Sequence, residues 1–181
     1  FGDSGGGLGP VTNWAWLLPK YKEPRLGWFY NYLKGGETLM DAIYETADVS
    51  KKDPFGENPV KLFRDVGTTV FKSGWNEDDF VFVMRTGPFV NHQHVDQGTF
   101  WLADRGKKFI EERHNSTYYL DPIYQPYYIQ PIAHSTILID GNKQSQRIGD
   151  QLYFAKGFED YAYMGHFLDS PKAAFSSGNI G

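Results

Sequence analysis

Residues 80–112, FVFVMRTGPFVNHQHVDQGTFWLADRGKKFIEE, decide the fold class that the sequence predicts. β-branched and aromatic residues fill three short runs within it, at 80–84, 99–103 and 108–112. The turn residues Asp104-Arg105-Gly106 separate two of these runs. Three later runs have the same character, at 135–139, 152–156 and 161–167. Short runs between turn signals are typical of antiparallel strands, so the sequence predicts an antiparallel β-sandwich.

The first sixty residues follow a different pattern. Apolar side chains return at helical spacing over 12–33, with a break at Pro24 and Gly27, and again over 37–46. The polar stretch 48–59 contains proline and glycine and reads as a connector. We therefore expect a few helices over residues 1–60 and a β-sandwich over residues 61–181, in a chain that is mainly β.

Composition excludes several classes of protein. The 181 residues include 18 Lys plus Arg and 22 Asp plus Glu, and a net charge of −4 argues against a general nucleic-acid binder. No stretch approaches the about 20 apolar residues that a membrane-spanning helix needs. Cysteine is absent, which excludes thiol catalysis and cysteine-ligated zinc. Because the chain starts with Phe1, we expect a processed chain or a piece of a longer one.

Histidines concentrate in one part of the chain, where four of the five lie between residues 92 and 134. If the run around the first two is extended, His92, His94 and Asp96 share one face at steps of about 6.5 Å. His134 stands at the start of one predicted strand, and Glu112 stands at the end of another. Two histidines with one carboxylate form a familiar zinc set, so one interpretation is a metal site at the strand ends. The other is an ordinary hydrogen-bonded role for each histidine.

Two further interpretations of the histidine motif compete with a zinc site. Cupin-like metal enzymes also carry a His-x-His motif, but they add a glutamate shortly after it. Here the motif is followed by Val, Asp, Gln and Gly at 95–98, so the cupin interpretation is disfavoured. A non-catalytic carbohydrate-binding or structural β-sandwich stays open, because such a motif can persist without turnover.

Five tyrosines crowd residues 118–128, and Pro122 and Pro126 between them predict a rigid loop. The tyrosines either pack as an aromatic surface that stacks on sugars or supply one phenol as general acid or base. The segment links Glu112 to His134, so it must pass close to any site that those two share. Nearby cations form either a solvated surface or a groove for an anionic ligand: Lys107, Lys108, Arg113, Lys143 and Arg147.

These motifs together resemble the heparinase II/III-like polysaccharide lyases. The resemblance rests on GPFVNHQHVDQGTFWLADRGKKFIEER at 87–113, the tyrosine segment, and IAHSTILIDGNKQ at 132–144. It covers about residues 60–147. The family fold is an α/α toroid followed by an antiparallel β-sandwich. The resemblance therefore implies that residues 1–60 are the last toroid helices with their linker, and that both ends of the chain are truncated.

The resemblance also implies a set of site residues. Zinc would be held by His94, Glu112 and His134. Glu112 stands where the family usually has Asp, which leaves Glu111 as a competitor, and Ser135 replaces a usual Asn. The residues assigned to catalysis are His92 and either Tyr119 or Tyr124. The residues assigned to substrate binding are Asn91, Arg113 and Tyr127.

The chemistry that the resemblance implies is β-elimination at a uronic acid. A base removes the C5 proton, and an acid protonates the departing O4 oxygen. The expected partners are an anionic polysaccharide or oligosaccharide and the missing N-terminal helical domain of the same parent chain. That domain normally supplies further catalytic groups, so we expect the parent to be a lyase and this segment alone to be inactive. The location implied by the resemblance is periplasmic or secreted.

Overall fold

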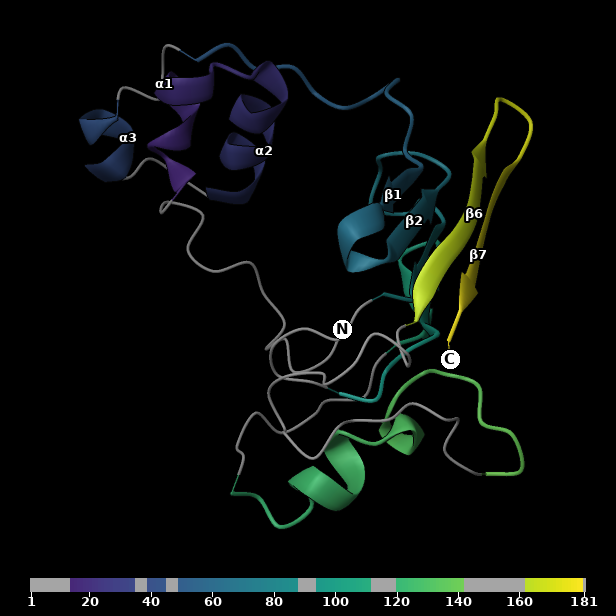
Figure 1. The fold of residues 1–181 in the computed structure, drawn as a ribbon. Helices are drawn as coiled ribbons and strands as arrows, with labels where there is room; N and C mark the ends of the chain where they lie inside the picture. Colours follow the sequence, from purple (N-terminus) through teal and green to yellow (C-terminus); the bar gives the residue numbers. More distant parts are fainter. Residues whose placement is uncertain are drawn as a thin grey trace. The chain divides into compact units, whose positions relative to one another are not determined.

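The computed structural model describes residues 14–34, 39–44, 49–87, 94–111, 120–141 and 162–180. Within these described residues, the chain divides into two compact units between Glu57 and Asn58. The first contains short helices, and the second contains antiparallel strands (Figure 1). The predicted fold class, mainly β with a few preceding helices, is confirmed. No helix in the described ranges is long and apolar enough to cross a membrane.

Three helices form the first unit: α1 (Leu17–Tyr21), α2 (Pro24–Lys34) and α3 (Leu39–Ile43). Helix α1 ends because Lys22 takes a left-handed conformation with φ 51°. Pro24 then starts α2, where its missing N–H costs no hydrogen bond. The predicted break is therefore present just before Pro24, whereas Gly27, the other residue at which it was predicted, lies inside α2.

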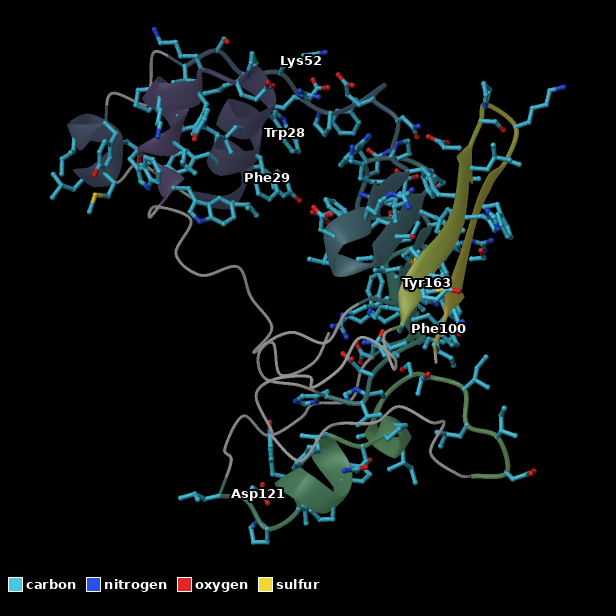
Figure 2. All side chains as sticks on the ribbon, in the orientation of Figure 1. Trp28, Phe29, Lys52, Phe100, Asp121 and Tyr163 are labelled. Atoms are coloured by element: carbon cyan, nitrogen blue, oxygen red, sulfur yellow. The ribbon has the colours of Figure 1, made fainter. Side chains whose placement is uncertain are left out.

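The helical unit has its own small core. Its buried residues are Ala15, Leu18, Tyr30 and Val49. Trp28 and Phe29 extend from α2 (Figure 2), where Trp28 stacks on Tyr32 with ring centroids 5.1 Å apart. The chain after α3 packs closely against α2 at Gly27. A Cβ at that position would lie only 2.6 Å from the Ser50 carbonyl oxygen. This close approach requires glycine at position 27.

Five strands form an antiparallel sheet in sequence order: β1 (Lys61–Phe63), β2 (Thr68–Lys72), β3 (Val81–Arg85), β4 (Thr99–Asp104) and β5 (Lys107–Ile110). The predicted turn joins β4 to β5, and both Arg105 and Gly106 have positive φ, at 50° and 68°. Two successive left-handed residues match the twist of a tight hairpin. On one face, Phe82 lies 6.1 Å from Phe71 and 5.9 Å from Phe100 between ring centroids.

A second sheet consists of the hairpin β6 (Tyr163–Asp169) and β7 (Ala174–Asn179). The hydroxyl oxygens of Thr69 in β2 and Ser176 in β7 are 3.0 Å apart. Thr86, directly after β3, contacts Met164 in β6. Thr69, Thr86 and Met164 are all buried, so the hairpin packs against the larger sheet, as Figure 1 shows beside β1 and β2.

One local prediction is wrong. Residues 135–139 do not form a regular strand; a 3₁₀ helix, Pro131–Ala133, precedes them, and turns and bends follow. Ile137 and Ile139 are 63% and 67% exposed, so their alternation does not mark a buried strand face. The described part of the tyrosine segment contains one turn of π-helix, Tyr124–Tyr128, a detail that the predicted rigid loop did not include.

The other strand predictions are largely confirmed. The runs at 80–84, 99–103, 108–112 and 161–167 correspond to β3, β4, β5 and β6, with ends that differ by up to two residues. The run at 152–156 lies outside the described residues. Three strands were not predicted, namely β1, β2 and β7.

Candidate functional site

The structure brings two of the three predicted metal ligands into contact. His94 Nδ1 lies 3.3 Å from His134 Nε2. The rings meet edge to face, with centroids 5.2 Å apart and an interplanar angle of 65°. His94 is 2% exposed and His134 is 8% exposed. Two imidazole nitrogens from segments far apart in the sequence therefore converge in the interior of the β unit.

The spacing of these nitrogens fits more than one chemistry. A hydrogen bond accounts for it if one ring donates its N–H and the other accepts. A shared ion also accounts for it, because two nitrogens bound tetrahedrally at about 2.0–2.1 Å from zinc lie about 3.3–3.4 Å apart. Neutral imidazole is a common zinc ligand, so the pair fits the metal by donor type and by spacing.

The third predicted ligand, Glu112, lies outside the described residues. Within the described part of the chain, no group of three or more His, Cys, Asp or Glu side chains is placed to hold a metal. The chain immediately before Glu112 does approach the histidine pair. The Ser135 hydroxyl donates to the Glu111 carbonyl oxygen over 3.0 Å, and Ser135 directly follows His134.

Glu111, the alternative ligand, is engaged elsewhere. Its carboxylate forms an ion pair with Lys108 Nζ at 2.8 Å, and the two side chains are about half to two-thirds exposed, at 51% and 63%. A carboxylate turned toward solvent is poorly placed to meet two buried imidazoles. The contact therefore keeps the Glu111 carboxylate away from the histidine pair. It also gives Lys108 an acidic partner, which weakens its assignment to a groove for anions.

Asp96 and His94 have different partners: His94 contacts His134, and Asp96 pairs with Arg85. The Asp96 carboxylate pairs with the Arg85 guanidinium at the end of β3, and the two side chains are 4% and 16% exposed. The Gly98 N–H also donates to the Arg85 carbonyl oxygen over 2.8 Å. Arg85 thus holds the segment that follows His94 against β3. Sequence reasoning missed Arg85, since an arginine at the end of a strand gives no sign of its partner.

The tyrosine segment contributes one ring to the histidine pair. Tyr124 is 2% exposed, and its ring meets that of His94 nearly at right angles, with centroids 6.1 Å apart. The Val95 N–H donates to the Ile129 carbonyl oxygen over 2.8 Å, so the same segment also contacts the chain beside His94. The tyrosine segment therefore lies beside the histidine pair at Tyr124.

Tyr127 lies further along the same turn. Its ring is half-buried and packs edge to face on Tyr128, with centroids 5.5 Å apart. The remaining predicted site residues lie outside the described residues: Asn91, His92, Glu112, Arg113 and Tyr119. Their roles stay predictions.

A cavity of about 200 Å³ opens on the segment that carries Tyr124 and His134. It is lined by Pro126, Gln130, Pro131, Ile132, Leu138 and Gly141. None of these six is a predicted site residue, and most are apolar. Among the described residues, its lining therefore does not include either histidine of the pair.

Solved structures with a similar fold carry the names heparan sulfate lyase and heparinase III. A mutant of the heparan sulfate lyase HepC from Pedobacter heparinus has a TM-score of 0.62 and 18% identity, covering 93% of this chain and 23% of that chain. A heparinase III has a TM-score of 0.59 and 17% identity, covering 88% and 22%. The chain thus spans less than a quarter of their length, and identities this low show the fold alone.

Comparison of the sequence itself gives the family. No curated protein sequence matches the chain. The model of the family described as "Heparinase II/III-like, C-terminal" matches residues 56–163, a range that includes every predicted site residue. Since this match covers more than half of the chain and the fold agrees with it, the chain belongs to the heparinase II/III-like, C-terminal family.

Proposed function

We propose that this chain is the β-sandwich part of a polysaccharide lyase that cleaves a uronate-containing glycan by β-elimination. Family membership supports the reaction class. The observation that carries the proposal is the buried contact between His94 Nδ1 and His134 Nε2 at 3.3 Å. Burying polar groups is costly unless they bind a partner. A metal ion shared by the two imidazoles would provide such a partner.

Zinc is the proposed metal, held by His94, His134 and Glu112. It would cross-link the segments that carry these ligands and so hold the sandwich side of the site together. Nitrogen and carboxylate ligands of this kind suit zinc better than calcium or magnesium, which prefer oxygen alone. The engagement of Glu111 by Lys108 supports Glu112 as the carboxylate ligand.

The protein groups that handle the substrate are assigned as follows. The base takes the C5 proton, the electron pair of that bond forms the C4–C5 double bond, and the O4 oxygen leaves with a proton from the acid. His92 and one tyrosine carry these proton transfers. Because Tyr124 is only 2% exposed and packs on the His94 ring, Tyr119 is the preferred phenol. Asn91, Arg113 and Tyr127 bind the anionic sugar.

The rest of the active site belongs to a helical domain of the parent protein. The isolated chain is therefore proposed to bind metal but to lack turnover, and the parent is proposed to act in the periplasm or outside the cell. A complete parent protein that binds zinc and uronate glycans without forming unsaturated uronate would favour the non-catalytic carbohydrate-binding alternative.

The metal content of purified variants tests the site. The chain and a His166→Ala control should each carry about one zinc per molecule, because His166 is exposed on β6. His94→Ala and His134→Ala should lose the zinc while keeping the β-rich circular dichroism spectrum. Undiminished zinc in His94→Ala would contradict the ligand assignment. Iron or manganese in place of zinc would favour the cupin-like alternative.

A further inference from the structure

Gln97 lies three residues after His94, is fully buried at 0% exposure, and joins three segments of the β unit. Its side-chain Oε1 accepts a hydrogen bond from the Gly87 N–H over 2.9 Å, just beyond β3. Its main-chain carbonyl oxygen accepts a hydrogen bond from the Thr136 hydroxyl over 2.7 Å. Thr136 is two residues after His134. One residue thus ties the segment of His94 to β3 on one side and to the segment of His134 on the other.

Further hydrogen bonds run along the seam between the two histidine segments. The Val95 N–H donates to the Ile129 carbonyl oxygen over 2.8 Å, and the Phe100 N–H donates to the Ser135 carbonyl oxygen over 3.1 Å. The bond from Thr136 to Gln97 lies between these two along the His94 segment. His94 and His134 therefore sit on two strips of chain that are held together on both sides of Gln97.

The close approach of the Thr136 hydroxyl to Gln97 also depends on Gly98, the residue after Gln97. Gly98 has a φ of 72°, and a Cβ there would lie 3.3 Å from Thr136 Oγ1 and 2.9 Å from a methyl carbon of Ile180. The chain thus turns through a left-handed residue where the threonine hydroxyl comes in. A buried glutamine followed by glycine gives the segment a specific geometry that apolar packing alone would not impose.

We propose that Gln97 and Thr136 are positioning residues that set the spacing of His94 and His134 and thereby raise the affinity of the metal site. This inference rests on the proposed function, in which these histidines hold zinc. Neither residue touches the metal; they act through the backbone on either side of the ligands. Residues that orient metal ligands typically contribute about 10–100-fold to metal affinity.

The test compares substitutions of equal chemistry at two threonines, the half-buried Thr136 and the buried Thr69. Thr136→Val removes the hydroxyl that bonds to Gln97, and Thr136→Ser keeps it. Thr69→Val is the matched control, because the Thr69 hydroxyl lies 3.0 Å from Ser176 Oγ in the contact between the two sheets. Gln97→Met removes the acceptor for Gly87 at similar volume. The measurements are the zinc dissociation constant by chelator competition and the midpoint of urea unfolding for each variant.

The proposal predicts that zinc affinity and folding stability respond to different substitutions. Thr136→Val and Gln97→Met should raise the zinc dissociation constant about tenfold or more, and Thr136→Ser should remain within about twofold of the parent chain. Thr69→Val should lower the unfolding midpoint and leave the dissociation constant unchanged.

Three results would overturn it. Equal dissociation constants in Thr136→Val and the unsubstituted chain would refute the positioning role. So would an equal rise in Thr69→Val, which would indicate a general loss of stability. Each of these two results refutes the positioning role alone. The proposed function stays intact as long as His94→Ala loses zinc in the same series. A chain that binds no zinc would remove both.

Discussion

Replacing Asp96 by asparagine should destabilise the β unit strongly, because it leaves the Arg85 guanidinium without its charged partner. The two side chains are 4% and 16% exposed. Breaking a buried ion pair from one side costs about 3–5 kcal/mol. The lower end applies here, since the remaining exposure of Arg85 lets the guanidinium reach some water. We expect a loss of about 3 kcal/mol in the free energy of unfolding, or about 10 °C in the midpoint.

Urea unfolding followed by circular dichroism measures this loss, and Lys108→Gln is the matched control. Lys108 also forms an ion pair, with Glu111 at 2.8 Å, but both side chains are at least half exposed. Exposed pairs contribute about 0–1 kcal/mol. The double variant Arg85→Met/Asp96→Asn should lose less than the sum of the single variants, because it leaves no buried charge unpaired.

The refuting result is a small effect at Asp96. If Asp96→Asn costs no more than Lys108→Gln, the carboxylate is not paired with Arg85 in solution. The segment after His94 would then not be held against β3 by this ion pair, and hydrogen bonds such as those from Gly98 to Arg85 and from Gly87 to Gln97 would link it to that strand.

Three further predictions concern the packing of each unit and the metal. Gly178→Ala should lower the unfolding midpoint of the β unit by several degrees, because the new Cβ would clash with Thr86. Gly165→Ala is the control and should change the midpoint much less, because its new Cβ would lie 3.1 Å from the nearest atom, Ser177 Oγ. Gly27→Ala should destabilise the helical unit, since its Cβ would lie 2.6 Å from the Ser50 carbonyl oxygen, and a loss of helical signal at lower urea checks this. Removing zinc with a chelator should lower the unfolding midpoint of the β unit, and adding zinc back should restore it; an unchanged midpoint would contradict the proposed metal site.

Local features of the β unit were predictable because their causes are local. The turn after β4 was marked by Arg105 and Gly106, which take the left-handed conformations that a tight hairpin needs. The failure at residues 135–139 has the opposite cause. Ser135 and Thr136 bond to Phe100 and Gln97, so long-range hydrogen bonds decide the path of that segment.

The candidate site was predictable in part. The residue types at His94 and His134 suggested a shared metal site, and the family resemblance paired them, but neither could give their 3.3 Å contact. The groups that hold the pair in place were not foreseen. Arg85 and Gln97 act through partners that only the folded chain brings near, and a sequence pattern records residue types without those partners.

The mass of the products formed by the complete parent protein tests the central claim most directly. Acting on a uronate-containing glycan, the parent should release oligosaccharides with an unsaturated uronate at the new non-reducing end. Each such product is lighter by one water molecule than the corresponding product of hydrolysis. Products of the hydrolytic mass, or no cleavage of any uronate-containing glycan, would contradict the assignment of this chain to a polysaccharide lyase.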